Sequence, residues 1–106
     1  MTETAFTTEV LKWAKTYQWR AFHVRNSGHG GNTHVQGDKG FPDLLLTRGN
    51  RFVAAELKIG KAGTKLGEPR REQRNWLAAL ERVGAETYVW RPENWSEILA
   101  VLSGRQ

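Results

Sequence analysis

Residues 43–59 have the sequence pattern of a tight β-hairpin. Apolar residues lie on both sides of Gly49-Asn50, a dipeptide that suits a two-residue hairpin turn. If these two residues form the loop, the register places Asp43 opposite Glu56. Directly opposed side chains have Cβ atoms roughly 4.5–5.5 Å apart, and like charges at that spacing are unfavourable unless a cation lies between them. The pattern therefore predicts both a hairpin and a pair of converging carboxylates.

Side chains alternate between the two faces of a strand, so the predicted hairpin has one polar and one apolar face. Lys58 lies two residues past Glu56 and shares the face of the carboxylates. The apolar face, a predicted core surface, collects Leu44, Leu46, Val53, Ala55, Leu57 and Ile59. Two carboxylates with a lysine beside them are typical of a Mg²⁺ site that hydrolyses phosphodiesters. The alternative is a solvated hairpin face whose charges have no chemical role.

The chain has 106 residues, which suits a single domain over residues 1–106 with a modest core. Its five tryptophans and four phenylalanines favour a folded globule. The absence of cysteine excludes disulfides and thiolate metal sites, and it is compatible with a reducing compartment. The sequence has no apolar run long enough for a membrane span and no apolar stretch typical of a signal peptide. We therefore expect a cytoplasmic protein, with a bacterial or phage-infected cell as its setting.

The net charge is +5, and the excess is local. Between Arg48 and Arg74 there are eight Lys/Arg residues against three Glu. A basic stripe beside a carboxylate pair favours a polyanionic partner, because basic side chains displace counterions from a phosphate backbone. A merely soluble basic surface is the alternative. The residues expected to contact DNA phosphates are Lys61, Lys65, Arg70, Arg71 and Arg74.

Hydrophobic periodicity and turn residues predict the order of elements as αβββαβα. Such an order forms a compact three-layer α/β domain with a mixed sheet. A glycine-rich loop over 27–40 either closes over DNA or is a disordered connection. The expected elements are a helix over 4–19, a strand over 21–26, hairpin strands over 43–47 and 52–59, a loop over 60–67, a helix between Pro69 and Gly84, a strand over 86–91, and a last helix from Pro92.

Two polar side chains fall on apolar helix stripes, where each needs a polar partner. Glu3 projects onto the stripe of Phe6, so we expect it to reach the metal centre, whereas Glu9 falls on the flank. The alternative for Glu3 is a frayed first turn favoured by the helix dipole. Gln73 shares a stripe with Trp76 and is expected to bond to a catalytic carboxylate or the scissile phosphate. The alternative for Gln73 is a satisfied core amide.

The histidines offer weaker signals. His23 lies on a predicted strand and is interpreted as structural, while the spacing of His29 and His34 matches no zinc pattern.

Three tryptophans on inward helix stripes are interpreted as core residues: Trp13, Trp76 and Trp95.

Together, these motifs resemble the PD-(D/E)XK nuclease superfamily and, within it, the VRR-NUC family. The likeness spans about Glu3 to Leu102. The chain departs from the family pattern between Gly60 and Gln73, where it is longer and more basic. The resemblance therefore does not define the substrate. The motifs are Gly40-Phe41-Pro42-Asp43, Ala55-Glu56-Leu57-Lys58, and Gln73 followed by Trp76-Leu77.

The resemblance implies a restriction-endonuclease-like αβββαβ core with an extra C-terminal helix, and a divalent-metal-dependent deoxyribonuclease. Asp43 and Glu56 would hold Mg²⁺, or Mn²⁺ as a substitute, and the backbone carbonyl of Leu57 is the implied third ligand. Lys58 would orient or deprotonate the attacking water. The expected catalytic residues are Asp43, Glu56, Lys58, Gln73 and Glu3.

Stand-alone members of this family resemble homodimeric, structure-selective nucleases that act on branched DNA such as four-way (Holliday) junctions. A homodimeric endonuclease for branched DNA is therefore the leading hypothesis. One alternative is a restriction-type or exonucleolytic enzyme on linear duplex. The other is a non-catalytic nucleic-acid-binding module, whose signature would be loss of a metal ligand or of the lysine. This sequence retains Asp43, Glu56 and Lys58.

Overall fold

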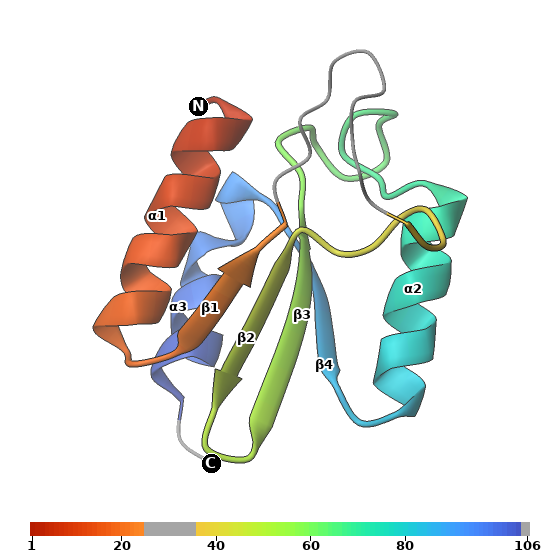
Figure 1. Cartoon of the computed structure of the whole chain (residues 1–106). Coiled ribbons are helices and arrows are strands. Elements are labelled where there is room, and N and C mark those ends of the chain that lie inside the picture. Colours follow the sequence, from red (N-terminus) through yellow and green to blue (C-terminus); the bar gives the residue numbers. More distant parts are fainter. Residues whose placement is uncertain (25–35, 105–106) are drawn as a thin grey trace.

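A four-stranded mixed sheet forms the middle layer of the structure (Figure 1). The computed structural model describes residues 1–24 and 36–104. The observed order agrees with the predicted αβββαβα arrangement. The elements are α1 (Glu3–Thr16), β1 (Arg20–His23), β2 (Leu44–Arg48), β3 (Arg51–Leu57), α2 (Arg71–Arg82), β4 (Glu86–Trp90), a short 3₁₀ helix η1 (Pro92–Asn94) and α3 (Trp95–Ser103).

The sheet order is β1-β2-β3-β4, in which β1, β2 and β3 are antiparallel and β4 runs parallel to β3. The β2–β3 hairpin has the predicted register, with Leu46 opposite Val53. Gly49 adopts a φ of 60°, as the first central residue of a type II′ turn requires. Extending this ladder by one residue places Asp43 level with Glu56.

The helices cover both faces of the sheet (Figure 1). α1 and α3 pack together on one face, and α2 packs on β3 and β4 from the other. The predicted apolar hairpin face is buried, except that Ile59 lies beyond the end of β3 and is exposed. No helix among the described residues is long and apolar enough to cross a membrane. The main core cluster contains Phe6, Val10, Ala14, Trp19, Leu44, Leu46, Val53, Ala55, Leu57, Trp90, Ile98 and Leu102.

The first helix ends earlier than expected, at Thr16 instead of residue 19. Gln18 has a φ of 71°, which turns the chain sharply before β1. This turn carries Trp19 into the core, where its Nε1 donates a hydrogen bond to the carbonyl of Leu102 at 2.8 Å. The following strand ends at His23, and its Phe22 side chain is 64% exposed.

The prediction of three core tryptophans is partly wrong. Trp19 and Trp90 are the fully buried ones, whereas Trp13 and Trp95 are half-buried and pack at the edge of the core cluster. Trp76 is half-buried outside that cluster, because the face of α2 that carries it meets residues 38–41.

The second helix begins at Arg71, so that Pro69 precedes it and does not lie in its first turn. Val83, which continues the helical spacing of Gln73 and Trp76 and for that reason is predicted to face inward, follows the last helical residue and is 78% exposed. Residues 25–35, with His29, His34 and most of the predicted glycine-rich loop, lie outside the described residues.

The segment before Asp43 is fitted closely against the start of α2. A Cβ atom on Gly40 would lie 2.5 Å from the carbonyl carbon of Glu72 and 2.7 Å from the backbone nitrogen of Gln73. Trp76 stacks edge-on against Phe41, with ring centroids 4.9 Å apart. Glycine at position 40 therefore allows the helix that carries Gln73 to approach the strand that follows Asp43.

We predict that Gly40→Ala destabilises the protein more than Gly37→Ala does. Gly40 and Gly37 both have positive φ values, 94° and 132°, but a Cβ atom on Gly37 meets none of the described residues within 4 Å. The difference between the two variants therefore measures the cost of a Cβ atom in the tight contact between Gly40 and the start of α2. It should be about 1–3 kcal/mol in the free energy of unfolding. Chemical denaturation measures it, and equal losses in the two variants would contradict the proposed packing role of Gly40.

Candidate active site

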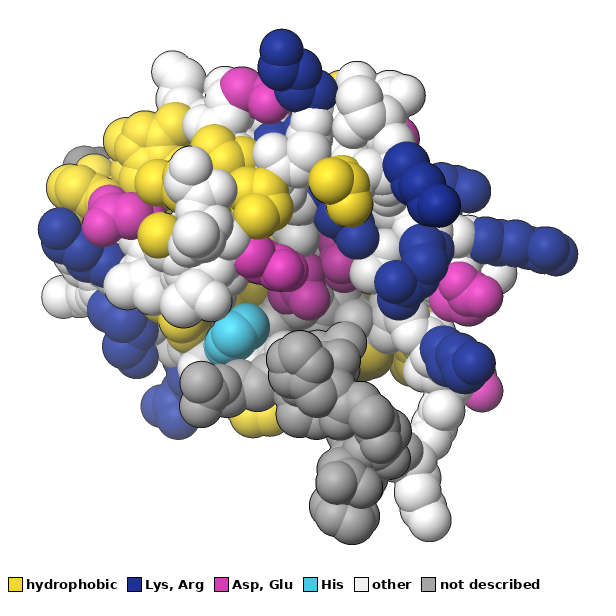
Figure 2. Space-filling model, turned by 90° about the horizontal axis from the view of Figure 1, so that it is seen from above, with side chains coloured by type: hydrophobic (Ala, Val, Ile, Leu, Met, Phe, Trp, Pro, Cys, Tyr) yellow, Lys and Arg dark blue, Asp and Glu magenta, His cyan; other side chains and the backbone are white. Residues whose placement is uncertain are grey.

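A cavity of about 660 Å³ opens where the start of α1, the end of β1 and the start of α2 surround the end of β3. Seen from above in Figure 2, acidic side chains gather in a hollow with Lys and Arg side chains along one side. The cavity contains all five residues for which a catalytic role is predicted. Its lining residues are Glu3, Thr4, Thr7, Thr8, Leu11, His23, Asp43, Glu56, Lys58, Arg70 and Gln73.

Asp43 is fixed at the point where the hairpin ladder ends. Its Oδ2 accepts a hydrogen bond of 2.8 Å from the backbone N–H of Leu57. The preceding Pro42 is fully buried and anchors the turn into β2. Since β2 begins only at Leu44, the carboxylate takes the place of a strand partner for the end of β3. The backbone itself therefore orients the Asp43 side chain toward Glu56.

Glu56 is 2% exposed, which is unusual for a carboxylate. Its Oε2 accepts a hydrogen bond of 2.7 Å from Gln73 Nε2 and lies 3.7 Å from Lys58 Nζ. Its Oε1 is buried and has no hydrogen-bond partner among the described residues. A buried charged oxygen without a partner is unfavourable, so the site is electrostatically incomplete as it stands.

Burial, as the larger cause, and the neighbouring Asp43 carboxylate together raise the pKa of Glu56 to about 8. The ammonium group of Lys58 acts in the opposite direction but is the weaker influence. In the absence of another cation, the carboxyl group of Glu56 therefore tends to keep a proton at neutral pH. A metal ion bound between the two carboxylates would remove the cause of this shift.

Gln73 is held in one orientation by its position near the start of α2. Its Oε1 accepts a hydrogen bond of 2.7 Å from the backbone N–H of Arg70, an N–H without a partner inside the helix. The amide NH₂ group must then face the cavity, where it donates to Glu56. The expected hydrogen bond between Gln73 and one of the two predicted site carboxylates is thus present.

Glu3 and Glu9 lie in different places. Glu3 is the first residue of α1 and lines the cavity, whereas Glu9 lines a separate groove with Pro92 and Trp95. The predicted inward projection of Glu3 is wrong: its side chain is exposed, because the first turn of α1 borders the cavity instead of the core. Of the two, Glu3 is the glutamate that can approach Asp43 and Glu56.

Thr7 and His23 are among the other polar residues that line the cavity. Thr7 is 7% exposed and lies one helical turn after Glu3, a spacing that places both on the same face of α1. His23, interpreted from the sequence as structural, ends β1 at the cavity wall. The sequence signal for Thr7 is weak, since it consists of the four-residue spacing from Glu3 alone.

The basic residues form one side of the site. Arg70 lines the cavity, while Lys61, Lys65, Arg71 and Arg74 are exposed on the adjoining loop and helix.

Arg91 fixes the loop that carries these lysines, a role that the sequence did not indicate. Its Nε donates to the carbonyl of Gly67 at 2.9 Å, and its Nη2 lies 3.2 Å from Glu68 Oε2. Glu68 in turn accepts a hydrogen bond from the N–H of Gly63 at 2.6 Å. The loop is therefore attached to the chain that follows β4.

The donor set of the cavity fits a hard divalent cation. The described residues contain no cluster of three or more His, Cys, Asp or Glu side chains that could hold a metal. Mg²⁺ does not require one, because it keeps several waters and is commonly held by one or two carboxylates. Asp43 and Glu56 supply two, and the unpartnered Oε1 of Glu56 is a free ligand atom.

The fold is similar to that of a solved structure, Hjc from Archaeoglobus fulgidus, a Holliday junction resolvase from an archaeal hyperthermophile. The TM-score is 0.54 and the sequence identity 22%, over 83% of this chain and 67% of that one. The sequence matches no protein-family model and no curated protein. At this identity the similarity shows the fold, and the chain has the restriction-endonuclease-like α/β fold with a mixed sheet that the motifs predict.

Proposed function

We propose that this protein is a Mg²⁺-dependent, structure-selective endodeoxyribonuclease that hydrolyses phosphodiester bonds in branched DNA such as four-way junctions. The observation that carries the proposal is the buried Glu56 carboxylate, with one unpartnered oxygen, in the same cavity as Asp43 and Lys58. Branched DNA as the substrate is supported by the similarity of the fold to that of a Holliday junction resolvase.

Four side chains of the cavity have distinct roles in this reaction. Asp43 and Glu56 would hold the metal ion, and the backbone carbonyl of Leu57 is a further candidate ligand. The bound metal supplies charge neutralisation at the phosphoryl oxygens and a more acidic water. Gln73 keeps Glu56 in place through its 2.7 Å hydrogen bond. Lys58 projects from the same face of the hairpin and orients the attacking water or accepts its proton.

The basic residues beside the cavity bind the substrate. Arg70 lies at the cavity wall and is suited to contact the phosphate next to the scissile bond. Lys61, Lys65, Arg71 and Arg74 extend this surface along the loop and the first turns of α2. Since a four-way junction requires two nicks, we further propose a homodimer with one site in each subunit, the commonest form of symmetric assembly.

We predict that Asp43→Asn, Glu56→Gln and Lys58→Ala each lower the cleavage rate by at least about 100-fold, because each removes a ligand or the group that handles the water. Glu81→Gln, on the exposed end of α2, is the matched control and should cleave normally. The measurement is Mg²⁺-dependent cleavage of a four-way junction, a flap, a linear duplex and single-stranded DNA. Normal turnover by any of the three variants contradicts the site assignment, and faster degradation of linear duplex than nicking of junctions favours the alternative nuclease.

The pKa of Glu56 predicts how the stability of the metal-free protein depends on pH. Between the ordinary glutamate value and about pH 8, the folded state holds a proton that the unfolded chain has released. Stability therefore falls as pH rises through this window.

Glu56→Gln should remove this pH dependence. The free energy of unfolding of the variant should therefore exceed that of wild type by an amount that grows with pH toward a few kcal/mol, at about 1.4 kcal/mol per pKa unit. Mg²⁺ should stabilise wild type most at the alkaline end of the window and should have little effect on the variant. Chemical denaturation in chelator and in Mg²⁺ measures both effects. Parallel pH profiles of the two proteins would show that Glu56 is not a strained, buried carboxyl group.

We predict that Glu3→Gln lowers the cleavage rate at least about tenfold, because it removes a carboxylate from the cavity wall beside the metal. Glu9→Gln makes the same chemical change on the same helix but faces a different groove, so it should leave the rate unchanged. Steady-state junction cleavage compares the two variants. A greater loss in Glu9→Gln would exclude Glu3 as the acidic residue that α1 contributes.

A further inference from the structure

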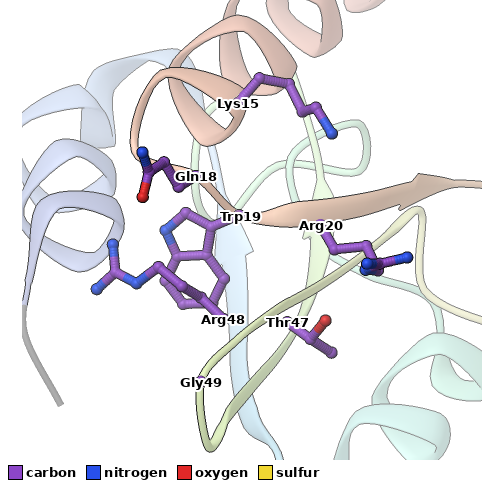
Figure 3. A pocket seen from close by; sticks show the side chains of 7 residues that line it. All are labelled: Lys15, Gln18, Trp19, Arg20, Thr47, Arg48 and Gly49. Carbon is purple, nitrogen blue, oxygen red and sulfur yellow. The ribbon is translucent and has the colours of Figure 1, made fainter.

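A second concave site lies at the opposite end of the hairpin from the carboxylates. It is a pocket of about 600 Å³ between the C-terminal end of α1 and the β2–β3 turn. Figure 3 shows its lining, to which α1, the following turn and two strands contribute. The polar side chains that line it are Lys15, Gln18, Arg20, Thr47 and Arg48.

The lining of this pocket carries three basic side chains and no acidic one. Among the described residues, no ion pair joins Lys15, Arg20 or Arg48 to a carboxylate. The amide of Gln18 and the hydroxyl of Thr47 add hydrogen-bond donors. A hollow with this lining has a positive potential and offers donors to an anion.

Arg48 forms a fixed positive wall of the pocket. Its guanidinium donates to the carbonyls of Tyr17 at 3.2 Å, of Leu102 at 2.9 Å and of Gly104, and it lies 4.7 Å from the centre of the Trp19 ring. These acceptors are neutral, so none of the described contacts of Arg48 offsets its charge.

The neighbouring Arg51 shows the contrast. It lies 5.0 Å from the same Trp19 ring, but its Nε donates to Glu86 Oε2 at 2.7 Å within an ion pair. Among the described residues, a carboxylate thus pairs with Arg51, and none pairs with Arg48 beside the pocket.

The pocket lies at the edge strand β1, and two of its residues share a sheet face with Asp43, whereas Arg48 projects from the opposite face, on which α1 and α3 pack. Thr47 lies four residues along the chain from Asp43, so both side chains project from the same face, and Arg20 pairs with Thr47. Four residues of strand span about 13 Å, which corresponds to about four base-pair rises of duplex DNA. A duplex arm that leaves the catalytic cavity along this face would bring a backbone phosphate to the pocket.

We propose that this pocket binds a backbone phosphate of the DNA arm that leads away from the cut, through Lys15 and Arg20. The inference rests on the proposed function, since it assumes a DNA substrate in the catalytic cavity. The arm is then held at two points, the cavity and the pocket, which fixes its direction relative to the sheet. Such a contact favours DNA whose arm follows the sheet face, and it adds a sequence-independent component to the binding free energy.

The test compares Lys15→Gln/Arg20→Gln with Lys12→Gln/Arg82→Gln, which removes the same charge from exposed positions that line neither the pocket nor the catalytic cavity. Binding to a labelled four-way junction is measured in chelator, so that nothing is cleaved, over a range of salt concentrations. If two phosphate contacts are lost, the salt slope should fall by about 1.8 in the pocket variant. It should fall less in the control. Thermal unfolding of both variants verifies that they are folded.

A second arm of the experiment locates the contact on the DNA. Neutral methylphosphonates replace the phosphates about three to five base pairs from the position at which wild type cuts the junction, the distance that the strand rise implies. They should weaken binding by wild type and have no further effect on the pocket variant, because the same interaction is already absent. The proposal would be overturned if the methylphosphonates and the double substitution weakened binding additively. Equal salt slopes in the pocket variant and the control would also overturn it.

The two proposals fail in different ways. A wild-type protein that binds junctions but cleaves no DNA in Mg²⁺ refutes the nuclease, while the binding comparison still tests the pocket. If wild type cleaves junctions and Lys15→Gln/Arg20→Gln binds them with the same affinity and salt slope as the control, the pocket proposal alone is refuted. If millimolar inorganic phosphate at constant ionic strength abolished the difference in junction binding between wild type and the pocket variant, the pocket would be a site for free phosphate. That result would overturn the proposed contact with the DNA arm.

Discussion

The register of the β2–β3 hairpin is the constraint on which the rest of the structure depends. Side chains alternate along a strand, so a slip of one residue would exchange the two faces of β3. Glu56 would then enter the apolar core beside α1 and α3, and Leu57 would take its place in the cavity. The observed pairing of Leu46 with Val53, and the bond from the Leu57 N–H to Asp43, exclude that slip. The fold and the candidate site are therefore specified by the same interaction.

This dependence explains why so much of the site could be predicted from the sequence. The hairpin is a local structure in which a two-residue turn determines every cross-strand pair, so the positions of Asp43, Glu56 and Lys58 follow from the chain alone. The contacts that complete the site join distant segments. The close approach of Gly40 to Glu72 and the bond from Arg91 to Gly67 leave no periodic trace in the sequence.

The errors in the predictions have a common physical cause. Helical periodicity identifies which residues share a face, but not where along the helix that face meets the core. The stripe that contains Phe6 is buried, yet its extension to Glu3 emerges at the cavity. The opposite error concerns Trp19, which sequence periodicity places at the end of a helix. A positive φ at Gln18 carries that side chain into the core instead.

The buried carboxylate also accounts for the way the site is assembled. Burial and the Asp43 carboxylate raise the pKa of Glu56 to about 8, and the ammonium group of Lys58, 3.7 Å away, offsets only part of this shift. The carboxyl group of Glu56 is therefore stabilised by whatever neutralises it, either a proton or a metal ion. Gln73 prevents the carboxylate from rotating away to solvent, since its own orientation is fixed by the backbone at the start of α2. If a divalent ion binds there as proposed, its charge would stabilise the ionised form of Glu56, so metal binding would be coupled to deprotonation of this carboxyl group.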